Sequence, residues 1–351
     1  MTSPSGTHAA DVAAPLREDA TDTGGESSGA SMRIVVTDWD QECLAEEEAV
    51  ARSRGMELVR ADCRTEEDVI RAAADARGIL VQYAPVTRKV FEALPGLKAV
   101  GRYGVGVDNV DVDAATEFGV AVCNVPDYGT EDVSDHALAL TMTLARGVAM
   151  LDRAVRRGDC SLAPAQPLHR LSGRVFGVVG LGLIGAATAR KARGVGYSTI
   201  GFDPLHTPGT VSPDGTEVVG FDELISRADV LSLHVPLNRH THHLIDADVL
   251  ARLKAGALLI NTCRGGVVDT EALVEALQSG TIRGAGLDVF EEEPLPPGAR
   301  LLGLDNVVLT PHAAWYSEES QEELKRRTAE NVMDAVAGQT PRNIVNPEVL
   351  Q

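Results

Sequence analysis

The stretch VFGVVGLGLIGAATARKARGVGYSTIGFDP, residues 175–204, decides the fold of this 351-residue chain. Its first apolar run predicts a strand over Val175–Val179, which leads into Gly180, Gly182 and Gly185 in G-x-G-x-x-G spacing and then into a helical pattern. Glycines at these places permit a tight turn, close approach of the backbone to a pyrophosphate, and close packing of helix on strand. The helix N-terminus would then bind the phosphates. The stretch therefore predicts a dinucleotide-binding turn in a parallel α/β sheet.

Asp203 indicates which dinucleotide is bound. A second apolar run ends in Asp203, 18 residues beyond Gly185, and no arginine follows it directly. A carboxylate there can accept hydrogen bonds from the adenosine ribose and would repel a 2′-phosphate. We therefore expect NAD rather than NADP as the cofactor. The alternative, in which the glycines serve only helix–strand packing, stays open at this point.

Short apolar runs alternate with helical patterns on both sides of this stretch, which is typical of parallel sheets covered by helices on both faces. The upstream runs are RIVVT, MELVRA, GILVQ, LKAVGR and VAVCN, with helical patterns near 41–53, 66–76, 87–93 and 111–118. A single long helix is predicted over 131–157. It is apolar around much of its circumference, so we expect it at a domain or subunit interface. An amphipathic helix is predicted over 318–337.

The composition excludes several classes of function. The formal net charge of −19 makes nucleic acid an unfavourable partner. We expect no membrane partner, because no apolar run reaches the length of a membrane span. Residues 1–31 are rich in Ser, Thr, Gly, Ala and Asp, so we expect a disordered tail. The cysteines show no disulfide or metal-ligand spacing, so we expect a cytoplasmic protein without a metal: they are Cys43, Cys63, Cys123, Cys160 and Cys263.

Three successive late strands are each followed by a polar residue that can do chemistry. Arg264 follows the run GALLINT, Asp288 and Glu293 follow RGAGL, and His312 follows NVVLT. The carboxyl ends of parallel strands meet at one edge of the sheet, where ligands bind. An arginine can hold the carboxylate and polarise the keto oxygen of a 2-oxo acid. A histidine oriented by a carboxylate can exchange a proton near neutral pH.

Each of these residues also has a structural interpretation when it is considered alone. Arg264 could be a surface arginine at a helix end, Glu293 a turn residue, and His312 a loop histidine with satisfied hydrogen bonds. Their occurrence after adjacent strands favours a shared active site.

Four motifs in order resemble the D-isomer-specific 2-hydroxyacid dehydrogenases from Met32 onward: GLGLIG, NTCRGGVVD, LDVFEEEP and TPHAAW. Within that family, AVCNVP, HHLI and PHAAWYSE are similar to the C-terminal binding protein branch. The resemblance implies catalytic roles for Arg264, Glu293 and His312. It further implies that Trp315 is an active-site tryptophan and that Asp288 meets the nicotinamide amide.

The resemblance also implies the topology and the substrate site. The fold class is α/β, with two Rossmann-like doubly wound parallel-sheet domains and the cofactor domain inserted into a flavodoxin-like substrate domain. The substrate-binding domain would comprise 32–124 and 319–351, and the NAD-binding Rossmann domain 125–318. The motif GRYGVGVDNVD resembles the family's substrate loop. The substrate-binding residues expected in addition to Trp315 are Arg102, Val105, Gly106 and Tyr83.

The expected activity is NAD-dependent interconversion of a 2-oxo acid and a D-2-hydroxy acid, in a homodimer formed through the cofactor domain. Arg102 beside Arg264 suggests a substrate with a second anionic group, such as a phosphonate or a carboxylate; alternatively, Arg102 only orients one carboxylate or pairs with a local acid. The alternative function is an NAD(H)-sensing scaffold or corepressor with little turnover. The cofactor-binding residues expected are Gly180, Gly182, Leu183, Ile184, Gly185, Asp203, His234, Pro236, Thr262, Cys263 and Asp288.

Overall fold

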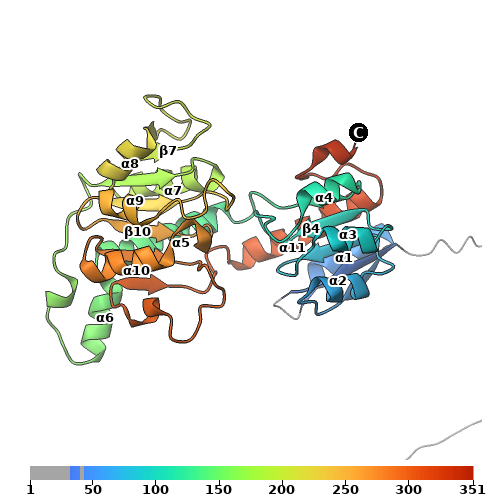
Figure 1. Cartoon of the computed structure of the whole chain (residues 1–351), viewed down its shortest axis with the longest axis horizontal. Coiled ribbons are helices and arrows are strands. Elements are labelled where there is room, and N and C mark those ends of the chain that lie inside the picture. The colour runs from blue at the N-terminus through green and yellow to red at the C-terminus, as the bar shows by residue number, and fades with distance from the viewer. Residues whose placement is uncertain (1–31, 40–42, 351) are drawn as a thin grey trace, which may run out of the picture. The chain divides into compact units, whose positions relative to one another are not determined.

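The structure is a computed structural model that describes residues 32–39 and 43–350. It contains two parallel sheets, as predicted, and each has helices on both faces (Figure 1). The expected disordered tail, residues 1–31, lies outside the described residues.

The first sheet has five parallel strands in the order β2-β1-β3-β4-β5, which is the flavodoxin-like order. Its central strands are rich in β-branched residues and almost fully buried, as strands covered on both faces must be. The pairing of Val35 with Ile79 is typical of its register. The strands are β1 (Arg33–Val36), β2 (Glu57–Arg60), β3 (Gly78–Val81), β4 (Ala99–Arg102) and β5 (Ala121–Cys123).

The second sheet has seven parallel strands in the order β12-β11-β10-β9-β6-β7-β8. The chain enters at β6 and the strand order reverses between β6 and β9, which is the switch point where doubly wound sheets bind dinucleotides. The strands are β6 (Val175–Val179), β7 (Ser198–Phe202), β8 (Glu217–Val218), β9 (Val230–Leu233), β10 (Leu258–Asn261), β11 (Gly284–Leu287) and β12 (Val307–Leu309).

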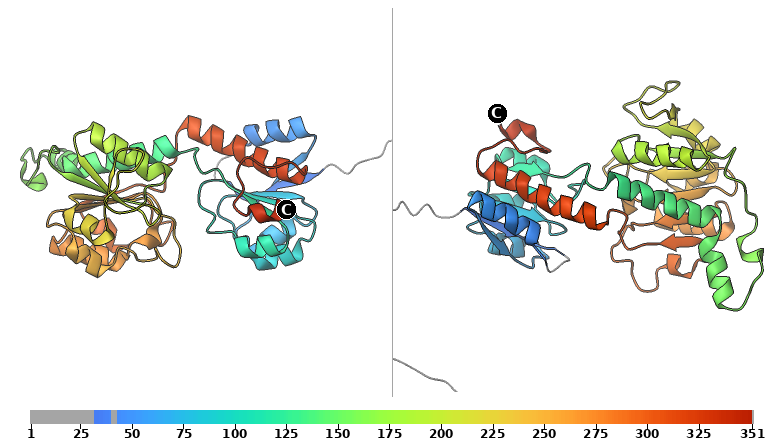
Figure 2. Two further views of the ribbon diagram at one scale, coloured as in Figure 1. Left: turned by 90° about the horizontal axis from the view of Figure 1, so that it is seen from above. Right: turned by 180° about the vertical axis from the view of Figure 1, so that it is seen from behind.

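Helices form a layer on each face of both sheets (Figure 2). On the first sheet, α1 (Ala45–Arg54) and α11 (Glu318–Val336) share one apolar cluster. The apolar cluster on the other face of this sheet contains residues of α2 (Glu66–Ala72), α3 (Arg88–Ala93) and α4 (Val112–Glu117). On the second sheet, one cluster contains α5 (Thr130–Ala145) and α7 (Leu183–Gly194). The other contains α8 (Phe221–Arg227), α9 (Ala247–Arg252) and α10 (Thr270–Ser279).

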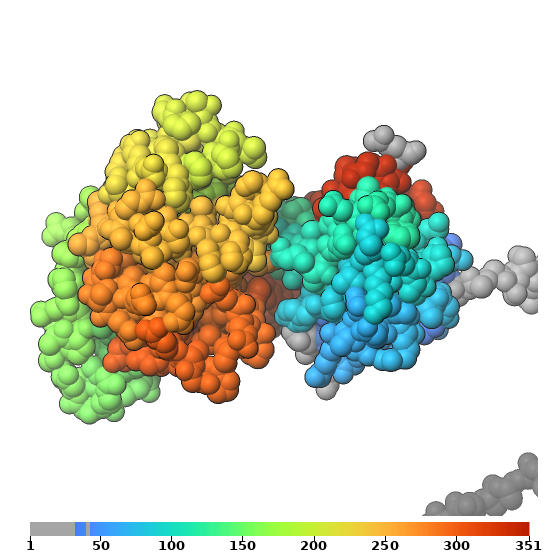
Figure 3. All heavy atoms as spheres, in the orientation of Figure 1, coloured from blue at the N-terminus to red at the C-terminus, as the bar shows by residue number. Residues whose placement is uncertain are grey.

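The last long helix, α11, returns to the first sheet. The space-filling view shows C-terminal residues, in red, against residues coloured blue and cyan (Figure 3). Two glycines make the close contact possible. A Cβ added to Gly78 of β3 would lie 2.6 Å from Val332 of α11, and one added to Gly101 of β4 would lie 2.4 Å from the same side chain. The helix therefore packs directly on the backbone of the central strands.

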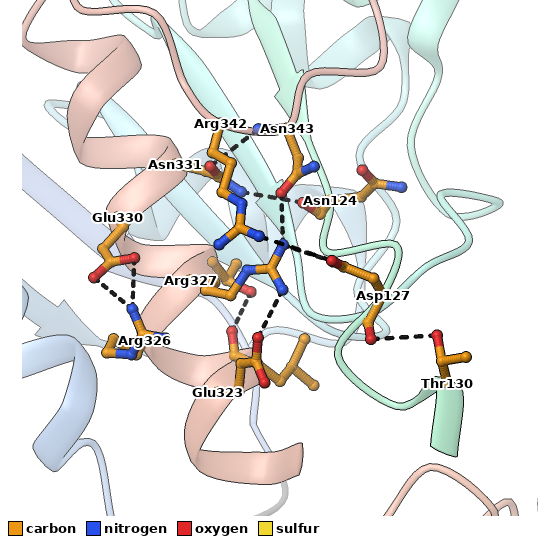
Figure 4. A network of polar contacts seen from close by, with 12 residues as sticks. Asn124, Asp127, Thr130, Glu323, Arg326, Arg327, Glu330, Asn331, Arg342 and Asn343 are labelled. Atoms are coloured by element: carbon orange, nitrogen blue, oxygen red, sulfur yellow. Dashed lines mark hydrogen bonds and ion pairs between the residues drawn. The ribbon is translucent and has the colours of Figure 1, made fainter. Parts of the chain in front are cut away.

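A buried arginine ties α11 to the segment that leads from the first sheet into α5 (Figure 4). The side chain of Arg327 is only 2% exposed, and it forms an ion pair with Asp127 at 2.6 Å. It also donates hydrogen bonds to Glu323 and Asn343 at 2.8 and 2.9 Å. These contacts satisfy most of the guanidinium, which is required for a cation at this depth.

The prediction of a single helix over 131–157 is wrong. The chain instead forms α5 and then α6 (Val148–Arg156), with a break at Gly147. Gly147 has φ +65°, a left-handed conformation that glycine adopts without steric cost. A Cβ there would lie 2.6 Å from the side chain of Ala165, so the returning chain also requires glycine.

The domain boundaries at 124/125 and 318/319 stay a prediction. The strands β1–β5 and helix α11 fall on one side of them, and the elements from α5 to β12 on the other. None of the described helices combines the length and apolar character needed to cross a bilayer.

We predict that Gly101→Ala destabilises the protein by about 1–3 kcal/mol, because the added methyl group overpacks the contact with Val332. Urea unfolding measures the change. Gly194→Ala is the matched control, since an added Cβ there meets no heavy atom within 4 Å beyond its own stretch of α7, among the described residues. Equal losses in the two variants would show that α11 does not pack on β4 as described.

Candidate active site

A pocket of about 420 Å³ lies at the carboxyl ends of strands from both sheets. It brings together most of the residues predicted from the sequence. Glu293, Gly180 and Asp203 do not line it, although Glu293 is hydrogen-bonded to His312, which does. The predicted residues that line it are Tyr83, Arg102, Val105, Gly106, Gly182, Leu183, Ile184, Gly185, His234, Pro236, Thr262, Cys263, Arg264, Asp288, His312 and Trp315.

The glycine turn after β6 has the geometry that a pyrophosphate requires. Gly180 has φ +92°, and a Cβ added to Gly185 would lie 1.9 Å from the carbonyl oxygen of Gly180. Within the described part of the chain, no side chain caps the N-terminus of α7, which begins after Gly182. Its first N–H groups can therefore bind an anion. In the same pocket, the buried hydroxyl of Thr262 has no hydrogen-bond partner among the described residues. These residues fit NAD.

Asp203 is held firmly at the end of β7. Its carboxylate accepts hydrogen bonds from the backbone N–H of Leu181 and from that of Leu205, each at 2.9 Å. The side chain is 14% exposed. The negative charge is thus fixed beside the glycine turn, where it would repel a 2′-phosphate.

His234, at the end of β9, is a neutral pocket wall. Its Nε2 lies 2.8 Å from the hydroxyl of Ser232. Burial lowers the pKa of His234 from 6.5 to about 3. The imidazole therefore carries no charge at neutral pH, beside the position where the glycine turn would hold the cofactor.

His312 and Glu293 form a hydrogen-bonded pair. The distance from His312 Nδ1 to Glu293 Oε2 is 2.8 Å, and the other carboxylate oxygen accepts the backbone N–H of Phe290 at 2.9 Å. Burial alone would raise the pKa of Glu293, but the hydrogen bond and charge of His312, the N–H of Phe290 and the charge of Arg264 hold it below its ordinary value. A carboxylate bound to Nδ1 leaves Nε2 of the imidazole to exchange a proton in the pocket.

Arg264 is oriented by two fixed acceptors. Its Nε donates to Asp108 at 2.8 Å, and Nη1 donates to the carbonyl oxygen of Cys263 at 2.7 Å. A Cβ at Gly106 would lie 2.1 Å from Nη2, so glycine makes room for the guanidinium. Two edges of the guanidinium are thereby fixed, which leaves Nη2 for an anionic ligand.

Arg102 is a second cation at the same pocket. Burial lowers its pKa, and the nearby charge of Arg264 lowers it further. Its Nε has no hydrogen-bond partner among the described residues. Beside it lies Tyr128, whose pKa burial raises to about 12 and whose ring centroid is 6.4 Å from that of Trp315. The pocket therefore combines a desolvated cation, a neutral phenol and an indole wall.

Asp108 and Tyr128 are among the residues that line the pocket and were not predicted from the sequence. Asp108 lies in the predicted substrate loop and orients the predicted arginine, and Tyr128 lies two residues before α5. An acidic residue inside a glycine-rich loop was the available signal for Asp108. A lone aromatic residue at a domain crossing was the signal for Tyr128. Within residues 32–39 and 43–350, no three His, Cys, Asp or Glu side chains converge as metal ligands would.

Comparison with known proteins agrees with the motifs. The family model described as D-isomer specific 2-hydroxyacid dehydrogenase, NAD binding domain, matches residues 138–314. A glyoxylate reductase of Korarchaeum cryptofilum is 45% identical over 270 residues, covering 76% of this chain and 81% of that protein. A D-3-phosphoglycerate dehydrogenase of Methanocaldococcus jannaschii is 39% identical over 284 residues, covering 80% of this chain but only 54% of that longer protein. The structure of an Aquifex aeolicus D-lactate dehydrogenase complexed with NAD and lactic acid has a TM-score of 0.80 at 29% identity, covering 89% and 99% of the two chains.

We predict that His234 makes the protein sensitive to acid. Its folded pKa of about 3 lies below the unfolded value of 6.5, so the unfolded state binds the proton more strongly. The stability present above pH 6.5 is then lost as the pH falls towards 3. Between pH 7.5 and 5.5, wild type should lose about 1 kcal/mol more of its free energy of unfolding than His234→Gln. Urea unfolding at both pH values measures this, and equal losses would contradict it.

Proposed function

The chain belongs to the D-isomer-specific 2-hydroxyacid dehydrogenase family, and on that premise we propose that it interconverts a 2-oxo acid and a D-2-hydroxy acid. It is an NAD-dependent oxidoreductase. The observation that carries the proposal is the pair formed by His312 and Glu293 in contact with the pocket that also holds Arg264. Proton exchange and carboxylate binding are the two tasks that this reaction sets for the protein.

The catalytic side chains have distinct tasks. NAD(H), when bound, supplies or accepts the hydride. Nη2 of Arg264 binds the substrate carboxylate and polarises the keto oxygen, since Nε and Nη1 are already engaged. Nε2 of His312 gives its proton to the oxygen during reduction and takes it back during oxidation. Glu293 keeps Nδ1 protonated and stabilises the charged imidazole.

Substrate recognition falls to the loop after β4 and to its aromatic neighbours. The backbone N–H groups of Val105 and Gly106 are proposed to bind the carboxylate. Tyr83 and Trp315 would enclose the rest of the substrate. A desolvated Arg102 favours a substrate with a second anionic group, a phosphonate or a carboxylate, because such a group would compensate the buried charge.

The proposal also covers the oligomeric state of the protein and its branch within the family. A homodimer formed through the cofactor domain is supported by exposed apolar side chains in and near α6, namely Val148, Val155 and Leu162. The C-terminal binding protein branch and a cytoplasmic location stay predictions. The scaffold alternative also stays a prediction; the relatives described above are named as a reductase and dehydrogenases.

We predict that His312→Ala lowers kcat by about 10²–10⁴-fold with NADH and a responsive 2-oxo acid, because the proton donor is lost. Arg264→Ala should lower kcat/KM by a similar factor, since both binding and polarisation are lost. Absorbance of NADH at steady state measures both. His169→Ala, an exposed histidine away from the pocket, is the control. Wild-type rates in the two active-site variants would disprove the assigned roles.

We predict that Arg102→Met acts selectively on substrates with two anionic groups. The value of kcat/KM should fall tenfold or more for oxaloacetate or phosphonopyruvate, because a buried charge pair is lost, and should stay within about twofold for pyruvate and glyoxylate. A panel of these four acids at saturating NADH measures the ratio. An equal loss on all four would mean that Arg102 orients the single shared carboxylate.

A further inference from the structure

A chain of hydrogen bonds runs from helix α5 to the loop that carries His312. Nε2 of His136, on α5, lies 2.9 Å from the hydroxyl oxygen of Thr310, and that hydroxyl donates to Oδ1 of Asp288 at 2.6 Å. Because the hydroxyl proton is committed to the carboxylate, the hydroxyl oxygen must accept the N–H of His136. The direction of donation is therefore fixed along the whole chain.

Asp288 is the last residue of this series of hydrogen bonds. Several of its oxygens hold the loop that carries His312. Its carboxylate accepts the backbone N–H of Ala313 at Oδ1 and that of Ala314 at Oδ2, each at 2.9 Å. Its backbone carbonyl oxygen accepts the N–H of His312 at 2.7 Å. The side chain of Asp288 is only 1% exposed. A carboxylate this deeply buried is stable only when such donors surround it.

The backbone conformation of His312 depends on these hydrogen bonds. His312 has φ +55°, one of only two positive φ values among the described residues that are not glycine. A non-glycine residue in this region costs about 1–2 kcal/mol, so the surrounding contacts must enforce it. The conformation determines the direction of the imidazole, and hence its hydrogen bond to Glu293. A rotation of the Asp288 carboxylate would release Ala313 and Ala314 together.

We propose that His136 and Thr310 are positioning residues for His312. Their hydrogen bonds fix the rotamer of the Asp288 carboxylate, and the carboxylate in turn fixes the loop at the geometry that presents the imidazole. Neither residue lines the pocket. The catalytic consequence rests on the proposed function, in which His312 exchanges the proton.

Steady-state kinetics test the catalytic consequence. Thr310→Val and His136→Leu should each lower kcat about tenfold while the KM of the 2-oxo acid changes less than twofold, because Arg264 is untouched. Thr310→Ser and His136→Gln should stay within about twofold of wild type, since each restores the hydroxyl or the side-chain N–H. The kcat of the double variant Thr310→Val/His136→Leu should be no lower than that of either single variant, because both substitutions interrupt the same series of hydrogen bonds.

Hydrogen exchange tests the positioning itself and needs no turnover. Peptides that cover Ala313 and Ala314 should exchange about tenfold faster in Thr310→Val and His136→Leu than in wild type. Thr141→Val is the control, because Thr141 is also buried on α5 but bonds only the carbonyl oxygen of Ala137. It should leave both kcat and exchange unchanged.

The outcomes separate the two proposals. Wild-type exchange and kcat in Thr310→Val and His136→Leu would overturn the positioning role. It would equally be overturned if the Ser and Gln variants were as impaired as Val and Leu, or if the double variant multiplied the losses. A wild type that turns over no 2-oxo acid would instead overturn the proposed function, and exchange would still decide whether the chain positions the loop.

Discussion

Parallel hydrogen bonding among β10, β11 and β12 is the constraint on which the active site depends. The three strands pair in register as neighbours, so residues that follow them emerge at one edge of the sheet. Arg264, Glu293 and His312 are separated by up to 48 positions in the chain, yet this pairing gathers them. Each of the three residues lies on a loop that follows its strand, so the pairing of the strands sets where these loops begin. The sheet supplies rigidity and the loops supply chemistry.

The pocket contains two arginines in a protein that is negatively charged overall. The chain carries a net charge of −19, and its pocket holds Arg102 and Arg264 beside neutral His234 and Tyr128, with Asp108 and Asp288 also in its lining. Burial keeps the histidine uncharged and the phenol protonated. An anionic substrate thus meets cations and neutral donors in a partly desolvated space, where each interaction is stronger than it would be in water.

Much of this arrangement could be predicted from the sequence because it follows from local rules. The glycine turn, the alternation of strands and helices, and the polar residues after strand ends each depend on a few neighbouring residues. The break at Gly147 could not be predicted in this way, because the apolar pattern continues through it and the contact with Ala165 comes from a later segment. The pair of Asp108 and Arg264 and the contact of His136 with Thr310 join residues more than 150 positions apart. Such contacts depend on how elements pack, which single-sequence patterns do not encode.

The packing of Val332 on Gly78 and Gly101 has a consequence for how the protein is made. The strands β1 to β5 are synthesised before β6 to β12, but α11, which together with α1 covers one face of their sheet, is synthesised after β12. Until α11 emerges, that face exposes apolar side chains to water. All strands of the second sheet, from β6 to β12, have been synthesised before then, so that sheet can bury its apolar core while synthesis continues. The first sheet therefore cannot complete its core until α11 has been synthesised, although its strands precede those of the second sheet in the chain.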